Sequence, residues 1–436
     1  KGQLIGIVAP DSDVMKLKIE IVRSDLDLFE GRLVEVLIGS ETVLYQIVNG
    51  LTREEIVEQR NSRGYVRAEA RKLGKWADDN FQSVKWVPEP NTPVFLVNID
   101  EPPFEISSVG FIPNTNYHIS VDLNSLVTHN TAILGILGVG KSCLAFELIE
   151  RLIAQRIKVI CLDLTNQYAL ELEPYFNQQV QNSEIASLQA IGSQGRTQVR
   201  QNVEEGGSVV EFRRELENQL NRFLTGNDQS DLLRIYNPAS FEVWRQDSKQ
   251  YQNTASMATL TPCEITRIIS EITLEILQGI GLSDQARCCL VFEESHSLVP
   301  EWNSAANDGD KTATNGTAKA ILQGRKYGLG CVIITQRTAN VTKSILNQCN
   351  TVFALRTFDS TGVEFLKNFV GDDYAGILSS LEDRHAVIFG KASSCKTPVM
   401  VRLNERDEFL EHFRPAISLH DEQILPGDPI VDDIPF

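Results

Sequence analysis

The sequence is poor in the features that define membrane and secreted proteins. It contains no run of about 18 consecutive apolar residues, so we expect no membrane-spanning helix. No secretory leader pattern opens the chain, and a start at Lys1 instead of methionine is what we expect of a processed or trimmed sequence. These absences favour a cytoplasmic protein.

Metal-binding and disulfide patterns are also missing. None of the eight cysteines forms a CxxC pair, and most lie inside apolar runs. We therefore interpret them as reduced thiols of the core rather than as zinc ligands or disulfides. The six histidines contain no HxxxH pair, so a metal site of that type is not expected.

Positive charge is in short supply, with 41 Lys and Arg against 58 Asp and Glu and a net charge of −17. A protein that coats nucleic acid with its whole surface would be basic. Contact with DNA would therefore need a local basic patch, such as a pore lining. The candidate clusters are Arg196–Arg200 and Arg213–Arg214, for which solvated loop and helix faces are the alternative interpretation.

The length of 436 residues suggests two or three domains. Apolar residues make up 42% of the chain, which is enough for a sizeable core. Over residues 1–108, short apolar or alternating runs separated by turn residues predict a small β-barrel or sandwich. The expected strands there are Gly2–Val8, Met15–Val22, Arg32–Ile38, Val43–Val48 and Pro93–Val97, with a short helix at Thr52–Arg60.

From Thr131 onward, apolar strands alternate with helical segments, which predicts an α/β domain with a largely parallel sheet. The expected strands are Ile133–Leu137, Lys158–Leu164, Leu232–Tyr236, Arg287–Phe292, Cys331–Ile334, Val352–Leu355, His385–Phe389 and Pro398–Leu403. The expected helices are Lys141–Gln155, Ser208–Phe223, Glu264–Leu277, Ala318–Lys326, Lys343–Gln348 and Gly362–Val370. We expect a polar surface insertion at Asn177–Gly207 and an acidic loop at Asn303–Asn315.

The strongest motif runs from Gly135 to Ser142 and matches GxxxxGK[ST], between an apolar strand and a helical segment. Glycines there let backbone N–H groups turn toward phosphate oxygens, and the helix N-terminus adds positive potential. Lys141 is expected to reach the β- and γ-phosphates of ATP, and the Ser142 hydroxyl to ligate Mg²⁺. The alternative is a glycine-rich junction without a ligand. The expected nucleotide-binding residues are Gly135, Gly138, Val139, Gly140, Lys141, Ser142 and Cys143.

Two carboxylates, Glu293 and Glu294, end a second apolar strand. Beside a P-loop, such a pair can offer one acid to Mg²⁺ and the next to the attacking water. We assign Glu293 to the metal and Glu294 to the general base; a solvated strand end is the alternative. Gln336 follows a further apolar strand and is expected to sense the γ-phosphate or orient water, unless it only caps the next turn.

In many ring ATPases, an arginine from the neighbouring subunit neutralises transition-state charge. Arg325, at a predicted helix end, is a candidate, with Arg337 and Arg356 as rivals; compensation of a helix dipole is the alternative. His296 is interpreted as a hydrogen-bonding partner near the site. Asp163 either contacts the nucleotide or caps the segment that follows it.

The order of these motifs resembles the HerA/FtsK branch of P-loop ATPases, and HerA in particular. The resemblance rests on Val121–Asn130, on FEESH at Phe292–His296, on GRKYGLGCVIITQR at Gly324–Arg337 and on LNQCNTVFALRT at Leu346–Thr357. The early strands, with LYQIVNG at Leu44–Gly50, resemble the small β-barrel that HerA shares with rotary ATP synthases.

This resemblance implies an α/β RecA-like P-loop ATPase domain over residues 109–415, with a polar and helical insertion around 170–260. An N-terminal β-barrel would precede it at 1–108. The tail at 416–436 lies beyond the resemblance, and its prolines and weak periodicity predict an extended C-terminal arm. It also implies a homohexameric ring that couples ATP hydrolysis to movement along duplex DNA in a central channel, with a nuclease or sirtuin-like effector in DNA processing or anti-phage defence. The residues on the family's matching positions are Lys141, Ser142, Glu293, Glu294, Arg325 and Gln336.

One segment departs from the family, which tends to read Asp-Pro-His-Gly-Glu-Tyr where Asp163–Tyr168 reads Asp-Leu-Thr-Asn-Gln-Tyr. Gln167 thus replaces a carboxylate, which puts any contact of that acid in doubt and hints at a divergent branch.

A ring scaffold that assembles an effector, with ATP as regulator, is the alternative function. A small GTPase or kinase is discounted because the NKxD motif and the kinase catalytic blocks are absent, and a conjugation-type secretion motor is a distant alternative.

Overall fold

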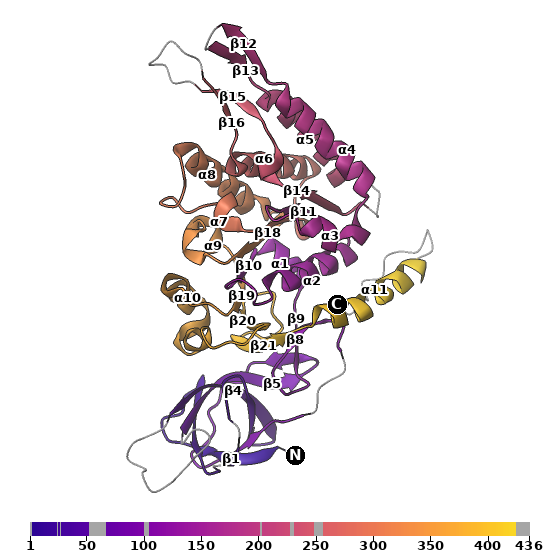
Figure 1. The fold of residues 1–436 in the computed structure, drawn as a ribbon. Helices are drawn as coiled ribbons and strands as arrows, with labels where there is room; N and C mark the ends of the chain where they lie inside the picture. Colours follow the sequence, from indigo (N-terminus) through magenta and orange to yellow (C-terminus); the bar gives the residue numbers. More distant parts are fainter. Residues whose placement is uncertain are drawn as a thin grey trace. The chain divides into compact units, whose positions relative to one another are not determined.

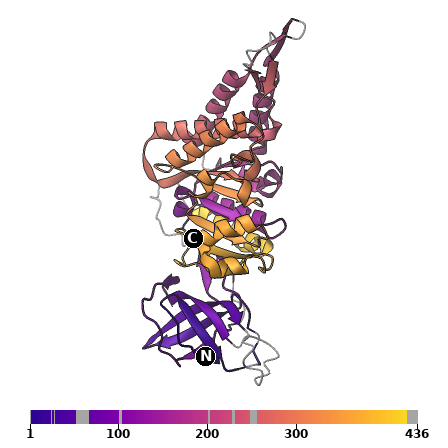
Figure 2. The ribbon, with the colours of Figure 1, turned by 90° about the vertical axis from the view of Figure 1, so that its left-hand side faces the viewer.

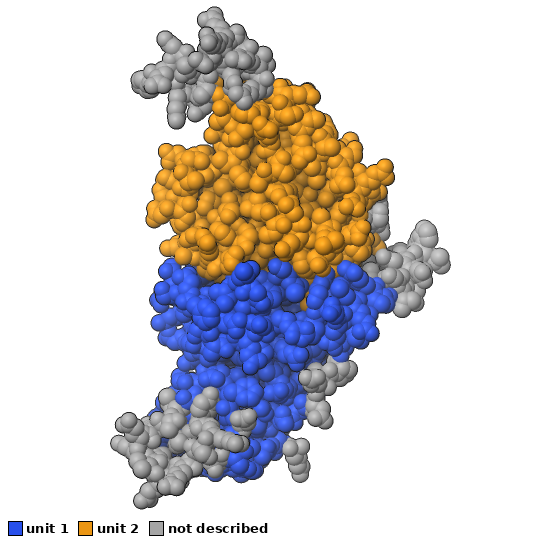
Figure 3. All heavy atoms as spheres, in the orientation of Figure 1, with its two compact units in different colours: residues 1–122, 135–144, 351–436 blue, residues 123–134, 145–350 orange. Residues whose placement is uncertain are grey.

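A computed structural model describes residues 2–23, 25–26, 28–51, 67–99, 104–200, 203–226, 231–247 and 256–423. The chain divides into two compact units, which are coloured separately in Figure 3. Unit 1 holds residues 1–122, 135–144 and 351–436, and unit 2 holds residues 123–134 and 145–350. Arg402 and Leu403 pair with Phe111 and Gly110, so C-terminal strands share unit 1 with residues before 122. The domain boundary at residue 108 stays a prediction.

The N-terminal part of unit 1 is a small antiparallel barrel (Figures 1 and 2). Its strands are β1 (Gln3–Val8), β2 (Lys16–Ile21), β3 (Leu33–Ile38), β4 (Glu41–Leu51), β5 (Arg67–Ala77), β6 (Asn80–Gln82) and β7 (Pro93–Leu96). They follow the order β2-β1-β7-β3-β4-β5-β6, and a further pairing of β2 with β5 closes the barrel. All five strands expected in this region are present, and the expected helix at Thr52–Arg60 lies outside the described residues.

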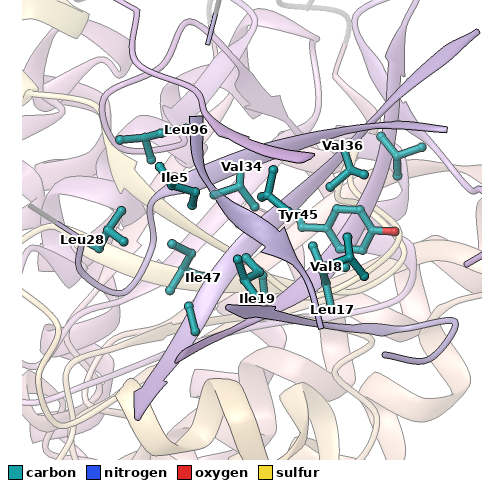
Figure 4. Packing of buried hydrophobic residues seen from close by; sticks show 14 of the residues in the cluster. Ile5, Val8, Leu17, Ile19, Leu28, Val34, Val36, Tyr45, Ile47 and Leu96 are labelled. Atoms are coloured by element: carbon teal, nitrogen blue, oxygen red, sulfur yellow. The ribbon is translucent and has the colours of Figure 1, made fainter. Parts of the chain in front are cut away.

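Alternation of apolar and polar residues explains why these segments form strands around one core. Figure 4 shows Ile5, Val34 and Tyr45 pointing into that core together with the other buried side chains. Strand β5 was not expected from the sequence, because its inward positions include Ala68 and Ala70 rather than large apolar residues. Small inward side chains between charged outward ones give a weak alternation signal.

A buried glutamine joins the barrel to the C-terminal strands of unit 1. The side chain of Gln46 is fully buried and donates to the backbone oxygens of Gly31 at 3.0 Å and Met400 at 2.8 Å. Its Oε1 accepts hydrogen bonds from the Met400 N–H at 2.8 Å and the Tyr374 hydroxyl at 3.0 Å. Asp373 adds ion pairs with Lys16 and Arg71 of the barrel. This polar contact is satisfied on every side, as a buried amide requires.

The rest of unit 1 contains antiparallel strands and two long helices. The strands are β8 (Ser108–Phe111), β9 (His118–Ser120), β19 (Thr351–Leu355), β20 (His385–Phe389) and β21 (Val399–Leu403), in the order β19-β20-β21-β8-β9. The helices are α10 (Ser360–Ile377) and α11 (Arg406–Gln423). Helix α11 continues through residues 416–423, so the start of the expected extended arm is helical; residues 424–436 lie outside the described chain.

Unit 2 is built on a parallel sheet with the strand order β14-β11-β17-β18-β10. These strands are β10 (Thr131–Leu134), β11 (Lys158–Leu162), β14 (Leu233–Tyr236), β17 (Ser283–Phe292) and β18 (Tyr327–Thr335). The helices around them are α1 (Leu123–Thr128), α3 (Tyr168–Glu171), α4 (Gln178–Ser193), α5 (Val209–Thr225), α6 (Pro262–Ile280), α7 (Ser295–Leu298), α8 (Asp308–Gly324) and α9 (Lys343–Leu346). Helix α2 (Lys141–Ala154) follows the glycine loop. The expected α/β fold class is thus confirmed.

Two polar stretches of unit 2 are more ordered than the sequence suggested. The acidic loop expected at Asn303–Asn315 ends early, because the Asn307 side chain caps α8 by accepting from the Asp310 N–H at 2.8 Å. The insertion expected around residues 170–260 includes β14, which belongs to the parallel sheet. Two hairpins, β12 (Arg196–Arg200) with β13 (Val203–Gly206) and β15 (Trp244–Asp247) with β16 (Ser256–Thr259), lie at the end of the unit away from the sheet in Figures 1 and 2.

Replacement of Gln46 by leucine tests the buried amide. Gln46→Leu leaves the Met400 amide and the Tyr374 hydroxyl buried without their partner, so we expect the free energy of unfolding to fall by about 3 kcal/mol. Urea unfolding of the purified protein measures the loss. Gln82→Leu is the control, because within the described residues the Gln82 side chain bonds only to the exposed Asp78, and it should change stability by less than about 0.5 kcal/mol. Equal effects of the two changes would contradict the prediction.

Candidate active site

The glycine loop of unit 1 has the backbone shape that phosphate binding needs. Gly138 and Gly140 have φ of 83° and 103°, a region in which a side chain would be strained. A Cβ on Gly135 would lie 2.8 Å from Leu355 Cβ, so that position is closed to larger residues as well. The loop is held by a hydrogen bond from the Ile136 N–H to the Arg356 oxygen at 2.9 Å.

Lys141 begins α2 and is 8% exposed. Its Nζ donates to the backbone oxygen of Ile136 at 2.6 Å, which keeps the ammonium over the loop. Ser142 and Cys143 are half-buried in the same turn, and that turn contains no acidic residue. The N-terminus of α2 therefore keeps its positive potential for an anion.

The expected acidic and amide residues of unit 2 lie where its parallel strands end, at one end of the sheet. Leu162 of β11 is opposite Phe292 of β17, and Phe292 is opposite Ile333 of β18. Since parallel strands in register end together, the residues that follow them meet at the same edge. The polar residues gathered there are Asp163, Glu293, Glu294 and Gln336.

Glu293 is 6% exposed and is held by a tyrosine that sequence reasoning did not select. The buried hydroxyl of Tyr168 donates to Glu293 Oε2 at 2.5 Å. Burial, and then the charge of Glu293, raise the pKa of Tyr168 well above its ordinary value, so the hydroxyl keeps its proton and stays a donor. The only signal in the sequence was a tyrosine at the end of a polar segment after an apolar strand.

Asp163 organises the loop that carries Tyr168. Its Oδ1 accepts from the Thr165 N–H at 2.7 Å and the Thr165 hydroxyl at 2.6 Å, and its Oδ2 accepts from the Tyr168 N–H at 3.0 Å. Of the two interpretations, capping of the following segment is therefore the one observed. Gln167 is exposed, and its side chain makes no capping hydrogen bond.

Glu294 adopts a left-handed backbone conformation, with φ of 50° and ψ of 47°. Such a conformation is costly for a residue with a side chain and is concentrated at functional sites. Gln336 Nε2 donates to Glu294 Oε1 at 2.7 Å, and His296 Nδ1 lies 3.2 Å from Glu294 Oε2. Gln336 and His296 therefore both contact the candidate base.

Arg325 lies at the opposite end of the strands from this cluster, just before β18 begins. It precedes the nine residues of β18 whereas Gln336 follows them, which at about 3.3 Å per residue separates the two by roughly 30 Å. Arg325 is exposed, and its Nη2 donates to His129 Nε2 at 2.6 Å. It cannot serve Glu294 of its own subunit from that position.

The other two candidates for the trans-acting arginine, Arg337 and Arg356, make different contacts from Arg325. Arg337 is exposed and follows Gln336 directly. Arg356 of unit 1 pairs with Asp383 and donates to the Leu381 oxygen at 3.2 Å. Arg213 pairs with Glu271 and Glu275, as on a solvated helix face, while the side chains of Arg196–Arg200 lie outside the described residues.

Two features are absent from the described ranges, namely metal sites built from protein groups alone and membrane helices. No group of three or more His, Cys, Asp or Glu residues in them could hold a metal ion. No helix in the described part of the chain is both long and apolar enough for a bilayer. All eight cysteines lie in the described ranges, where none forms a disulfide and seven are buried, and burial raises the pKa of Cys288 and Cys349 to about 12.

Known proteins resemble this chain over most of its length. Residues 106–268 match the family model described as the central domain of helicase HerA. The chain is 21% identical to a probable helicase of Methanocaldococcus jannaschii, MJ1565, over 86% of this chain and 83% of the relative. It is 22% identical to the DNA double-strand break repair helicase HerA of Sulfolobus acidocaldarius, over 94% and 93%. Among solved structures, the pCW3 conjugation coupling protein TcpA matches 96% of this chain and 93% of its own, with 12% identity and a TM-score of 0.40.

The glycine loop and these sequence similarities make the chain a P-loop ATPase. Within that class its sequence is similar to helicases of the HerA type, as the motifs suggested.

The Tyr168 hydroxyl provides a test of the acidic cluster. Tyr168→Phe keeps the ring, whose centroid lies 4.8 Å from that of Phe146, and removes only the donor to Glu293. A hydrogen bond to a charged acceptor contributes about 1.5–3 kcal/mol, so we expect ATP turnover to fall about tenfold or more and to need more Mg²⁺. Steady-state hydrolysis over a Mg²⁺ series measures both.

Tyr236→Phe is the matched control. Tyr236 is equally buried, on strand β14 beside β11, and its hydroxyl has no hydrogen-bond partner among the residues that the structure describes. Its removal should leave turnover unchanged. If both variants keep the wild-type rate and Mg²⁺ dependence, Tyr168 does not position Glu293 for the reaction.

Proposed function

We propose that the protein is an ATP-driven motor that moves along duplex DNA as a hexameric ring and works with a nuclease or another effector. The observation that carries the proposal is the Gln336–Glu294 hydrogen bond of 2.7 Å, which lies just beyond the end of β18, the strand that pairs with β10. Strand β10 pairs in parallel with β18, so that Leu134 lies opposite Thr335. The chain continues from Leu134 into the P-loop at Gly135 and from Thr335 into Gln336.

The residues divide the work of hydrolysis between them. The backbone N–H groups of the P-loop and the Lys141 ammonium bind the phosphates of ATP. Glu294 takes the proton of the attacking water, and Gln336 orients the carboxylate or the water through its amide. Glu293 accepts a hydrogen bond from Tyr168, whereas Glu294 contacts Gln336 and His296, so the two acids have different partners and can have separate tasks.

Magnesium fits the oxygen donors that these residues offer. Mg²⁺ prefers one or two protein oxygens and completes its shell with phosphate and water, so a protein-only cage is not required. Ser142 and Glu293 are the residues that would hold it, and the metal would neutralise charge on the phosphates. Tyr168 keeps Glu293 oriented by its hydrogen bond of 2.5 Å.

Movement on DNA is supported by the relatives and not contradicted by the acidic composition. The Sulfolobus acidocaldarius relative is named as a DNA double-strand break repair helicase. A ring confines DNA contact to its channel, so a net charge of −17 is compatible with binding there. Arg325, exposed and roughly 30 Å from the cluster of its own subunit, is suited to act on the site of a neighbour.

A ring scaffold that activates an effector, with ATP as its regulator, is the second candidate. The two hairpins β12–β13 and β15–β16 favour it, because they form small sheets of their own that lie apart from the parallel sheet. Either function would operate in the cytoplasm, and a role in defence against phage suits both. DNA-stimulated ATP turnover would support the motor, and ATP dependence of effector assembly alone would support the scaffold.

Substitutions of Lys141 and Glu294 separate binding from hydrolysis. Lys141→Ala should weaken ATP binding at least tenfold, because the phosphates lose their cation. Glu294→Gln should bind ATP normally but hydrolyse it at least about 100-fold more slowly, since an amide cannot accept the proton. Equilibrium binding of a fluorescent ATP analogue and phosphate-release kinetics provide the two measurements. Normal hydrolysis by Glu294→Gln would reject the base assignment.

Mixed rings test whether Arg325 acts across the subunit interface. Arg325→Ala subunits should inhibit wild-type subunits out of proportion to their share, because each one disables its neighbour's site. Turnover is measured over a titration of variant into wild type at constant total protein. Arg337→Ala is the control arginine and should dilute activity linearly. A linear response for Arg325→Ala as well would exclude the trans role.

A further inference from the structure

We infer that Arg384 is a positioning residue of the P-loop and that Glu405, at the head of α11, holds Arg384 in place. The inference rests on the proposed nucleotide site and adds two residues that no motif in the sequence indicated. Both lie in unit 1 with the P-loop itself.

The backbone of Arg384 orients one peptide plane of the loop. Its N–H donates to the Val139 oxygen at 3.0 Å. In a trans peptide the carbonyl and the following N–H point in opposite directions. Since the Val139 oxygen points to Arg384, the Gly140 N–H points away from Arg384, which is the side that we assign to the phosphates. One donor of the phosphate cradle is thus oriented before any nucleotide binds.

The side chain of Arg384 packs directly on the same part of the loop. A Cβ on Gly140 would lie 2.9 Å from Arg384 Cγ, so Gly140 has no room for a side chain. Arg384 itself has φ of 60°, a left-handed conformation that few residues other than glycine adopt. A non-glycine residue stays in that region only when its surroundings hold it there.

Those surroundings are strand β21 and the start of α11. The Arg384 oxygen accepts from the Leu403 N–H at 2.8 Å, and the guanidinium forms an ion pair with Glu405. The Glu405 oxygen accepts from the Phe409 N–H at 2.9 Å in the first turn of α11. A continuous chain of contacts therefore runs from α11 through Glu405 and Arg384 to Val139 and Gly140.

The Glu405 side chain is also partly exposed and faces a cavity. Its side chain is 39% exposed and lines a cavity of about 510 Å³ that Phe104, Phe111 and Met400 also line. A shift of α11, or a group that competes for Glu405, would release Arg384 from its partner. The affinity of the P-loop for nucleotide is thereby coupled to the position of α11.

Nucleotide binding by the full chain tests this coupling. The probe is a fluorescent, non-hydrolysable ATP analogue, titrated with Mg²⁺ present. Arg384→Gly keeps the backbone N–H and relieves the left-handed conformation but removes the ion pair, and Glu405→Gln removes the pair from the other side. We expect each to raise the Kd about three- to tenfold, with kcat at saturating ATP within about twofold of wild type. Both variants should fold normally, so their thermal unfolding midpoints should equal or exceed that of the control variant Glu408→Gln.

Two further variants sharpen the test. Glu408→Gln removes the same charge one turn along α11, from an exposed position, and should leave the Kd unchanged. The reversed pair Arg384→Glu with Glu405→Arg should bind more tightly than either single exchange, because the attraction is restored with opposite polarity.

The outcomes are distinct. If Lys141→Ala weakens binding while Arg384→Gly and Glu405→Gln bind like wild type, the inference is wrong and the nucleotide site stands. Equal loss in Glu405→Gln and Glu408→Gln would also overturn it, since net charge alone would then explain the effect. Equal binding by wild type and Lys141→Ala would reject the nucleotide site and this inference with it.

Discussion

The account depends on one constraint, the parallel in-register pairing of β10, β18, β17 and β11. Because the strands end together, the short stretches of unit 2 that follow β11, β17 and β18 are brought to the same end of the sheet. The P-loop follows β10, Gln336 follows β18, the acid pair follows β17 and Asp163 follows β11. A register shift of one strand would separate these groups, whatever their identity in the sequence. Buried apolar side chains on all four strands maintain that register.

Where these strands end, a contact with a neighbouring residue holds each polar side chain in its orientation. Asp163 shapes the loop that brings Tyr168 to Glu293, and Gln336 and His296 contact Glu294. In unit 1, Arg384 and Arg356 hold the P-loop through the Val139 oxygen and the Ile136 N–H. Such supporting contacts keep reactive groups within the small tolerances that catalysis demands.

The fold and the motif residues could be predicted from the sequence because their signals are local. The P-loop is a contiguous pattern, and the strands before Glu293 and Gln336 are apolar runs that end in polar residues. The supporting residues could not be predicted in that way. Tyr168 and Glu293 are 125 positions apart, and nothing near Arg384 marks it as a neighbour of Gly140. Strand β5 and the start of α8 were missed because small or acidic residues weaken the periodicity.

The central claim is that the P-loop and the Glu294–Gln336 pair act on one nucleotide. An experimental structure of the chain with Mg²⁺ and a non-hydrolysable ATP analogue tests it most directly. The account predicts the γ-phosphate at Lys141, with a water beside it that contacts Glu294 and Gln336. An analogue seated in the P-loop with Glu294 and Gln336 beyond the reach of one bridging water, about 6 Å, would contradict it.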